Sequence, residues 1–407
     1  MSFTPVQRRD LRLLASLRGV SFLGDAVALV ALFLRLSHTG HPWNIAALSI
    51  AAALPGVLLA PLAGVVVDSV SAKRLLSALC GAQAGVCVAL GLWHGTAATI
   101  ALMALLSCGG AFAYPGYTAL VPTITGEENI ASGQSTMQAV QGVASTAGPA
   151  VGGLLVGLFG QSWPFYVDAA TFVVAGVATL FLSSDRRPEP GGARAAKDGR
   201  HLSAGLRLLF GDRVLLPLVV CVTVFFLAYS MVNVAEVFFT VRTLHGTSLM
   251  YGLVGTSFGV GSVVGALGAR RLDQSPLRLV RTTLVAIVVV SVSVGTVGLV
   301  EHVGYMYPLL FTSGVAVGVA NVAFLTLYAV RIDEARRGQV FAAIGALFTS
   351  AEISATAIGG LVLTVIAPRT VFQIAGVACT LTAVVLGPIA LRSSRRAHAT
   401  EQAPQGA

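Results

Sequence analysis

Charged residues are scarce in this chain of 407 residues. Asp, Glu, Lys and Arg make up only 11% of it, whereas a typical soluble domain has about 25%. Hydrophobic residues make up 55%, and the mean hydropathy is +0.83. This composition argues against a soluble protein and indicates an integral membrane protein.

Cysteines or histidines at the spacing of a metal site or a disulfide framework are also lacking. The five cysteines all lie in apolar runs and form no CxxC pair; they are Cys80, Cys87, Cys108, Cys221 and Cys379. We interpret them as small apolar filler, so we expect neither a disulfide framework nor a metal site. The seven histidines are scattered along the chain. We therefore expect no bound metal and no cofactor.

Nucleotide-binding and catalytic motifs are missing as well. No GxxxxGK[ST] stretch is present, which argues against an ATP-driven pump. No polar segment is long enough for a catalytic or sensory domain, so we do not expect an enzyme, and a membrane receptor is the least favoured function. The net charge of +9 sits in short Arg clusters without interleaved aromatic residues. We therefore expect no nucleic-acid partner.

Long apolar runs fill most of the chain. A helix needs about 20 apolar residues to cross the hydrocarbon layer of a membrane. Twelve segments meet this requirement: 14–36, 44–67, 75–93, 97–121, 134–159, 163–182, 214–240, 248–268, 281–300, 304–330, 339–366 and 370–391. Pro164 suits the start of the sixth helix. We predict an all-α integral membrane protein with twelve transmembrane helices.

The basic residues test this count. If both chain ends are cytoplasmic, all but four of the 26 Lys and Arg residues fall in cytoplasmic segments; the exceptions are Arg18, Arg35, Arg242 and Arg369. Such an asymmetry follows the positive-inside rule. It predicts a multi-pass protein of the cell (plasma) membrane with cytoplasmic N- and C-termini.

The long polar segment 183–213 divides the chain. Its first part is rich in Pro, Gly and Arg, as in flexible linkers. Its second part, HLSAGLRLLF at 201–210, has leucines at the spacing of an amphipathic helix on the inner membrane surface. We predict six-helix bundles over 1–182 and 214–391, with this linker between them and a cytoplasmic tail over 392–407.

The two halves resemble each other. SGQ at 132–134 is followed by VGG at 151–153, and RGQ at 337–339 is followed by IGG at 358–360. Two pseudo-symmetric six-helix bundles with internal duplication are typical of secondary transporters, in which the binding site lies between the halves near the middle of the membrane.

The stretch GVVVDSVSAKR at 64–74 resembles the loop signature of the major facilitator superfamily. Gly64 and Asp68 match that signature, and Lys73 and Arg74 supply its basic end. The resemblance implies that the loop locks the two halves together on the inner side, with Asp68 as the latch. An ordinary interfacial charge is the alternative.

The second half contains a counterpart of this loop, GALGARR at 265–271. It keeps the basic pair Arg270 and Arg271 but has no acidic residue. By the same resemblance, we include these two arginines in the predicted cytoplasmic gate.

A glycine-rich stretch, GVASTAGPAVGG at 142–153, resembles the antiporter motif of the same family. Its motif residues are Gly142, Gly148, Pro149, Gly152 and Gly153. Small residues let a facing helix approach closely, and a proline inside a helix bends it. We predict a tight, kinked seam between the halves here; generic glycine packing is the alternative.

Three further stretches recur in the exporter branch of this family, which includes macrolide and enterobactin efflux proteins. They are SFLGD at 21–25, HLSAGLRLLF at 201–210 and RGQVF at 337–341. The resemblance spans nearly the whole chain. It implies a proton-coupled exporter, an antiporter of small, largely hydrophobic organic molecules such as antibiotics, that works by alternating access. An importer or a lipid or siderophore transporter of the same fold is the alternative.

Asp25 lies near the middle of the first apolar segment. A carboxylate at that depth costs about 2.5–3.5 kcal/mol on insertion scales. Arg18 lies seven residues earlier, two turns away on the same helix face. Burial disfavours a charged carboxylate and a nearby cation favours it, so we predict that Asp25, with Arg18, carries the coupling proton. A structural pair or a polar kink beside Gly24 is the alternative.

Other acidic residues lie within the apolar segments. We predict that Glu352 in the eleventh segment is a second proton site or a contact for a cationic substrate. A carboxylate that only forms hydrogen bonds within the helix bundle is the alternative. Asp168 and Glu236 lie nearer the outer ends of their segments. There they would close the outer side by pairing with Arg35 or Arg242; interfacial solvation is the alternative.

Polar uncharged residues complete the predicted cavity. Candidates for its lining are Tyr114, Gln138, Gln141, Asn233 and Asn321, and hydrogen bonding between helices is the alternative for each. Few fixed charges predict loose, hydrophobic selectivity. The partners we expect are membrane lipid, protons and a small hydrophobic substrate, with the protein acting as a monomer.

Overall fold

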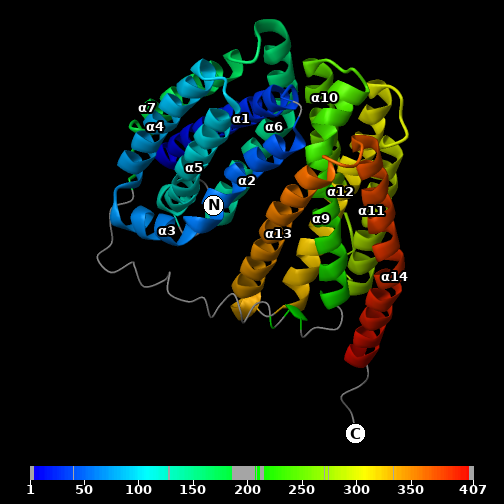
Figure 1. Ribbon diagram of the computed structural model, residues 1–407. Coiled ribbons are helices and arrows are strands. Elements are labelled where there is room, and N and C mark those ends of the chain that lie inside the picture. The colour runs from blue at the N-terminus through cyan, green and yellow to red at the C-terminus, as the bar shows by residue number, and fades with distance from the viewer. Residues whose placement is uncertain are drawn as a thin grey trace. The chain divides into compact units, whose positions relative to one another are not determined.

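The chain divides into two compact units, Met1–Lys197 with Gly246–Thr256 and Asp198–His245 with Ser257–Ala407 (Figure 1). The computed structural model describes residues 4–39, 41–126, 129–185, 207, 209–210, 215–269, 271–273, 275–332 and 334–402. Within these residues the secondary structure is helical and no strand is present. The predicted all-α membrane fold is confirmed.

Seven helices and the beginning of an eighth build the described part of the first unit. They are α1 (Pro5–Ser37), α2 (Pro42–Leu58), α3 (Ala60–Ser69), α4 (Ala72–Leu92), α5 (Thr96–Thr125), α6 (Ile130–Phe159), α7 (Trp163–Thr179) and the first turns of α10 (Ser248–Ala269). Helix α1 packs against α6 and α7, α4 packs against α5 and α7, and α2 packs against α5. Leu14, Leu76 and Tyr117 lie in the apolar core between these helices.

Local sequence signals set several helix ends. The Thr4 side chain accepts a hydrogen bond from the Gln7 amide at 3.3 Å, and the Gln7 side chain accepts one from the Thr4 amide at 3.0 Å. This reciprocal capping box starts α1 at Pro5. Helices α5 and α6 end at Gly126 and Gly160, which have φ angles of 74° and 87°. A residue with a side chain is strained in that conformation, whereas glycine adopts it readily.

The second predicted segment is broken in two. Helices α2 and α3 meet at an angle of 54°, a bend that Figure 1 shows between their labels. Pro55 lies inside α2, and a second proline starts α3. A proline removes a backbone hydrogen bond and clashes with the preceding turn, so this pair of prolines explains the break.

The number of spans can be compared with the twelve predicted. Among the described residues, ten helices are long and apolar enough to cross a membrane, or eleven if α2 and α3 together form one span. The remaining predicted segment, 163–182, corresponds to the 17-residue helix α7. This helix is shorter than predicted because residues 180–182 leave it in a turn.

The described part of the second unit consists of six helices, one of them ending in a π-helical turn, and a short 3-10 helix. They are α9 (Leu215–Phe238) with the π-helical turn Phe239–Thr243, the rest of α10, α11 (Pro276–Val297), the 3-10 turn Val303–Tyr305, α12 (Met306–Arg331), α13 (Glu334–Val362) and α14 (Pro368–Gln402). Helix α11 packs against α12 and α14, and α9 packs against α13 and α14. Helix α14 continues past residue 391, because no proline or glycine interrupts its polar end before Pro404.

The predicted linker lies mostly outside the described residues. In the expected surface helix at 201–210, only Arg207, Leu209 and Phe210 are described, and all three are helical. Arg270, a predicted gate residue, also lies outside the described part of the chain.

Many large apolar side chains of the helices are exposed. Leu58 is 65% exposed, Val143 69% and Leu158 66%. A soluble protein rarely exposes many such side chains together. Lipid hydrocarbon is the solvent that suits these side chains.

Candidate functional site

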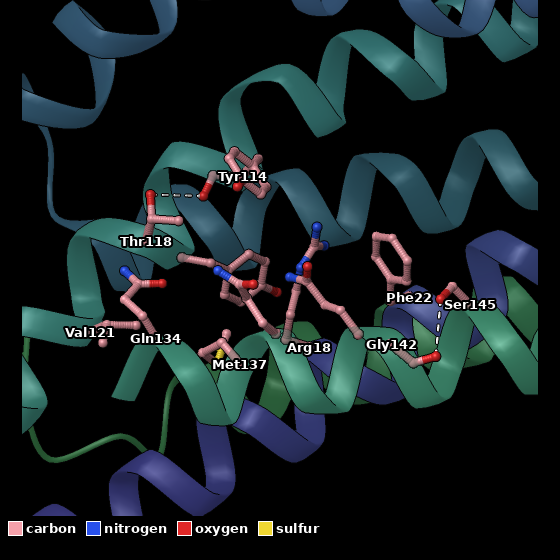
Figure 2. Close-up of a pocket in the computed structure, with 12 residues that line it drawn as sticks. Arg18, Phe22, Tyr114, Thr118, Val121, Gln134, Met137, Gly142 and Ser145 are labelled. Atoms are coloured by element: carbon pink, nitrogen blue, oxygen red, sulfur yellow. Dashed lines mark hydrogen bonds between the residues drawn. The ribbon is translucent and has the colours of Figure 1, made fainter. Parts of the chain in front are cut away.

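A pocket of about 480 Å³ lies among α1, α5 and α6 of the first unit (Figure 2). Its lining is Arg18, Phe22, Tyr114, Tyr117, Thr118, Val121, Gln134, Met137, Gln138, Gln141, Gly142 and Ser145. Pockets for small organic ligands measure about 300–1,000 Å³. Three residues predicted to line a cavity, Tyr114, Gln138 and Gln141, are therefore brought together at one pocket of suitable size.

Arg18 is the charged residue of this lining. Its guanidinium lies 5.3 Å from the ring centre of Phe22 and 5.1 Å from that of Tyr117, within the range of cation–π contacts. Its Nε is buried without a hydrogen-bond partner. Within the described part of the chain, Arg18 makes no ion pair. Among the described residues, this pocket cation therefore has aromatic contacts but no counter-ion within bonding distance.

Asp25 lies two turns along α1 from Arg18 and is half-buried. It lies within electrostatic range of Arg18 but is not part of the pocket lining. Gly24 beside it packs directly against Asp168 and Thr171 of α7, where any added Cβ would overlap both side chains. The two acidic residues Asp25 and Asp168 are thus brought close together across the α1–α7 contact.

Asp168 is fully buried. Its carboxylate accepts hydrogen bonds from Cys87 Sγ at 3.2 Å and from Thr171 Oγ1 at 3.2 Å. No ion pair joins it to Arg35, the predicted partner, among the described residues. It lies beside Gly24, in the interior of the unit, and not at the outer end of α1 where Arg35 is located.

Arg35 binds backbone carbonyl groups instead. Its guanidinium donates to the carbonyl oxygens of Leu90 at 2.8 Å, Trp93 at 3.3 Å and Gln161 at 3.4 Å. It also lies 4.5 Å from the ring centre of Phe165. Five N–H donors in one plane let an arginine bind several carbonyl groups at once where a helix end and a loop meet. In this structure Arg35 therefore binds carbonyl groups and does not pair with Asp168, and closure of the outer side by Asp168 or Glu236 with Arg35 or Arg242 stays a prediction.

The corresponding pair in the second unit is also not formed. Arg242 lies 5.3 Å from the ring centre of Phe238, and no ion pair connects it to half-buried Glu236 within the described residues. Glu352, Asn233 and Asn321 lie on exposed faces of their helices. Arg271, the described member of the basic pair, is exposed as well.

The loop between α3 and α4 has a partner that the sequence did not suggest. Asp185 accepts hydrogen bonds from Ser71 Oγ at 2.7 Å and from the Lys73 amide at 3.3 Å. The Lys73 ammonium donates to the carbonyl oxygen of Leu182. The first turn of α4 is therefore held by the chain that leaves α7.

The other residues of the loop signature flank this contact. Asp68 lies half-buried in the last turn of α3, and Arg74 is exposed in the first turn of α4. Gly64 faces open space, because an added Cβ would meet no atom within 4 Å.

The glycines of α6 differ in what they contact. Gly148 packs against Ala26 of α1, and Gly152 packs against the backbone of Val27. Gly153 packs against the backbone at the beginning of α10. Gly142 lines the pocket and has no atom within 4 Å of an added Cβ. Three of the four motif glycines thus allow close helix contacts.

Pro149 and its neighbours contact α10 through a hydroxyl group that sequence reasoning missed. Thr256 Oγ1 donates to the carbonyl oxygen of Thr146 at 3.0 Å and accepts from the amide of Ala150 at 3.1 Å. Thr256 therefore bridges a backbone donor and acceptor one turn apart in α6, at the site of the proline.

Comparison with known proteins agrees with this architecture. The model of the Major Facilitator Superfamily matches residues 14–356. The MFS-type transporter YfiS of Bacillus subtilis is 25% identical over 403 residues, covering 95% of this chain and 93% of that protein. Macrolide efflux protein A of Streptococcus pyogenes is 22% identical over 345 residues, covering 82% and 84%. The enterobactin exporter EntS of Citrobacter koseri is 26% identical over 279 residues, covering 67% and 61%.

Solved structures show the same fold. The nucleoside transporter NupG superposes with a TM-score of 0.70 at 14% identity, covering 93% of this chain and 98% of that one. A bacterial homologue of the human lysosomal transporter Spinster, in an inward-facing and unoccupied conformation, gives a TM-score of 0.66 at 12% identity and covers all of both chains.

Ten or more apolar helices of membrane length and a polar pocket within one helical unit define a multi-pass membrane protein. The chain belongs to the major facilitator superfamily, since the family's model matches most of its length. Its relatives are transporters and not enzymes, which confirms the resemblance seen in the loop and glycine motifs.

Proposed function

We propose that the protein is a proton-coupled exporter of small, largely hydrophobic organic molecules and works by alternating access. Two relatives carry names that state efflux or export, macrolide efflux protein A and enterobactin exporter EntS. The distribution of basic residues supports both chain ends in the cytoplasm. The proposal places the protein in the plasma membrane and has it act as a monomer. The six-helix bundles over 1–182 and 214–391 are its moving halves.

The half-buried carboxylate of Asp25, close to Arg18, carries this proposal. At about 10 Å of helix rise, the attraction between the two charges is about 2 kcal/mol at an effective dielectric of ~20. Burial opposes the charged form of Asp25. A carboxylate under two opposing influences changes its protonation when its access to water changes. Asp25 therefore carries the proton, and Arg18 adjusts how readily it is released.

Two other parts of the molecule have supporting roles. The loop around Asp68, Lys73 and Arg74, together with Gly64 and the basic pair at 270–271, forms the cytoplasmic gate. The motif glycines of α6 form the seam along which helices slide during the cycle. Glu352, exposed on α13, is a candidate second proton site.

Transport into vesicles tests the proposal. A compound against which the protein protects a drug-sensitive bacterium would be added outside everted membrane vesicles, and an imposed pH gradient, acid inside, would drive its uptake. We expect uptake by the natural protein and its loss in Asp25→Asn, while exchange of substrate without a pH gradient persists. Glu301→Gln, at an exposed position between α11 and α12, serves as a matched loss of an acid elsewhere. Full gradient-driven uptake by Asp25→Asn would contradict the role of Asp25, and gradient-driven efflux from everted vesicles would indicate import.

A further inference from the structure

The pocket of the first unit combines an apolar wall with a set of hydrogen-bonding groups. Phe22, Val121 and Met137 supply apolar and aromatic surface. Gln134 and Gln138 offer amide groups, which donate and accept hydrogen bonds. Figure 2 shows Arg18 extending from α1 into the space between α5 and α6. The lining thus suits a ligand with an apolar body and a polar head.

The residues that line the pocket carry positive charge and no negative charge. Arg18 is the charged residue among the twelve that line it, and no carboxylate is part of the lining. The nearest acid on the same helix, Asp25, lies two turns away, outside the lining. A ligand head in this pocket therefore meets a guanidinium group first.

The Arg18 guanidinium has unused hydrogen-bonding capacity. Its Nε is buried without an acceptor, and its contacts with the rings of Phe22 and Tyr117 supply no oxygen acceptor on the pocket wall. Each buried donor without an acceptor costs free energy that a bound acceptor would recover. Carbonyl and carboxylate oxygens fit the planar fork of N–H donors.

We propose that this pocket binds organic molecules that present an oxygen acceptor, a carbonyl or a carboxylate, to Arg18, and that it excludes molecules whose head group is an amine cation. An ammonium group would lose its water without gaining a carboxylate on the pocket wall, and it would face Arg18. This inference rests on the proposed function only in treating the pocket ligand as the transported substrate. Binding itself does not require transport.

Three dansyl compounds of similar size test the proposal on the purified full chain in lipid nanodiscs. Dansylglycine has a carboxylate head, dansylglycinamide a neutral carbonyl head and dansylethylenediamine an ammonium head. Their fluorescence reports entry into an apolar site. We expect at least one oxygen-headed compound to bind about 10- to 100-fold more tightly than the ammonium compound, as for hydrogen bonds to a charged group. Comparison of the acid with the amide shows whether the pocket prefers a carboxylate oxygen or a neutral carbonyl oxygen.

Variants of Arg18 complete the test. Arg18→Gln should remove most of the preference for oxygen heads and leave the affinity for the ammonium compound equal or higher, whereas Arg18→Lys should retain part of the preference. Arg278→Gln, at a position 71% exposed in the second unit, is the control for loss of a positive charge. The proposal is overturned if the ammonium compound binds as tightly as both others, or if Arg18→Gln leaves the preference unchanged.

Transport of the same compounds separates this inference from the proposed function. If the oxygen-headed compound binds through Arg18 but a pH gradient drives no transport of it, proton-driven export fails and the pocket assignment stands. If a pH gradient drives export of the ammonium compound alone, the proposed function stands and the pocket assignment fails.

Discussion

The carboxylate of Asp10 accepts a hydrogen bond from the backbone amide of Ser183 at 2.9 Å, although 173 residues separate the two in the chain. The same oxygen accepts from the Ser184 amide at 3.1 Å, and Asp10 is fully buried. Asp185, which directly follows Ser184, accepts hydrogen bonds from Ser71 and Lys73. Asp10 and Asp185 therefore fasten the chain that leaves α7 both to α1 and to the loop before α4.

We expect Asp10→Ala to destabilise the protein, because it removes both acceptor contacts with Ser183 and Ser184. A hydrogen bond to a charged group contributes about 1.5–3 kcal/mol, so the thermal unfolding midpoint in detergent should fall measurably. Asp10→Asn keeps an acceptor oxygen, so its thermal unfolding midpoint should fall less. Equal midpoints for the natural protein and Asp10→Ala would show that this contact does not stabilise the unit.

The sequence was sufficient to predict the helices because each has a simple physical signal. Membrane length, apolar composition and the side on which the arginines lie depend on single segments, and they predict the fold without any contact between segments. The break between α2 and α3 has a local signal as well, in Pro55. Gly148 and Gly152, which the resemblance marked, lie in close contact with α1 of the same unit.

The contacts of individual polar residues were harder to predict, because they depend on how segments far apart in the chain pack. Arg35 illustrates this point: charge alone suggested an acidic partner, whereas it donates to two carbonyl groups at the end of α4 and to one in the loop between α6 and α7. The roles of Asp10, Asp185 and Thr256 have no sequence motif at all. The pocket was partly predictable, since polar residues within apolar helices pointed to Tyr114, but Gln134 and its neighbours near the helix end gave no separate signal.

Arg35→Lys should destabilise the first unit although it preserves the charge. A single ammonium group cannot reach the carbonyls of Leu90, Trp93 and Gln161 together, and it lacks the flat surface that lies over Phe165. Leaving the buried carbonyl group of Leu90 without a donor costs about 1–3 kcal/mol. A thermal midpoint lower than that of the natural protein is expected. An unchanged midpoint would mean that water or the lysine satisfies these groups.

Asp273 predicts a small pH dependence outside the membrane. The Ser275 amide donates to its carboxylate at 2.8 Å and Arg278 lies 2.9 Å away, and both lower the pKa of Asp273 below its ordinary value. A group whose pKa is lowered in the folded state stabilises the protein above its unfolded pKa, which is about 3.9 for Asp. This stabilisation is lost as the pH falls through the pKa of the folded state. The difference in thermal midpoint between the natural protein and Asp273→Asn should therefore shrink on acidification. A difference that is constant with pH would contradict this assignment.

Thr256→Val should weaken the contact between α6 and the start of α10. Valine keeps the shape of threonine but lacks the hydroxyl group that bridges Thr146 and Ala150. Thr256→Ser restores the hydroxyl and serves as the matched rescue. We expect lower thermal stability and slower transport for the valine variant, with recovery in the serine variant. Equal behaviour of all three proteins would show that the bridge has no energetic role.

Two glycines of α6 provide a matched test of the close helix contacts. An added Cβ at Gly153 would overlap the backbone oxygen of Ser248, whereas an added Cβ at Gly157 would meet nothing within 4 Å. Overpacking of a tight contact costs about 1–3 kcal/mol, and α10 cannot yield easily because its backbone is the obstacle. We therefore expect Gly153→Ala to lower the thermal midpoint and the transport rate. Gly157→Ala, on the same helix, should equal the natural protein or exceed it in stability, because alanine is the better helix former. If both variants lose stability to the same extent, flexibility of α6 and not contact with α10 is what these glycines provide.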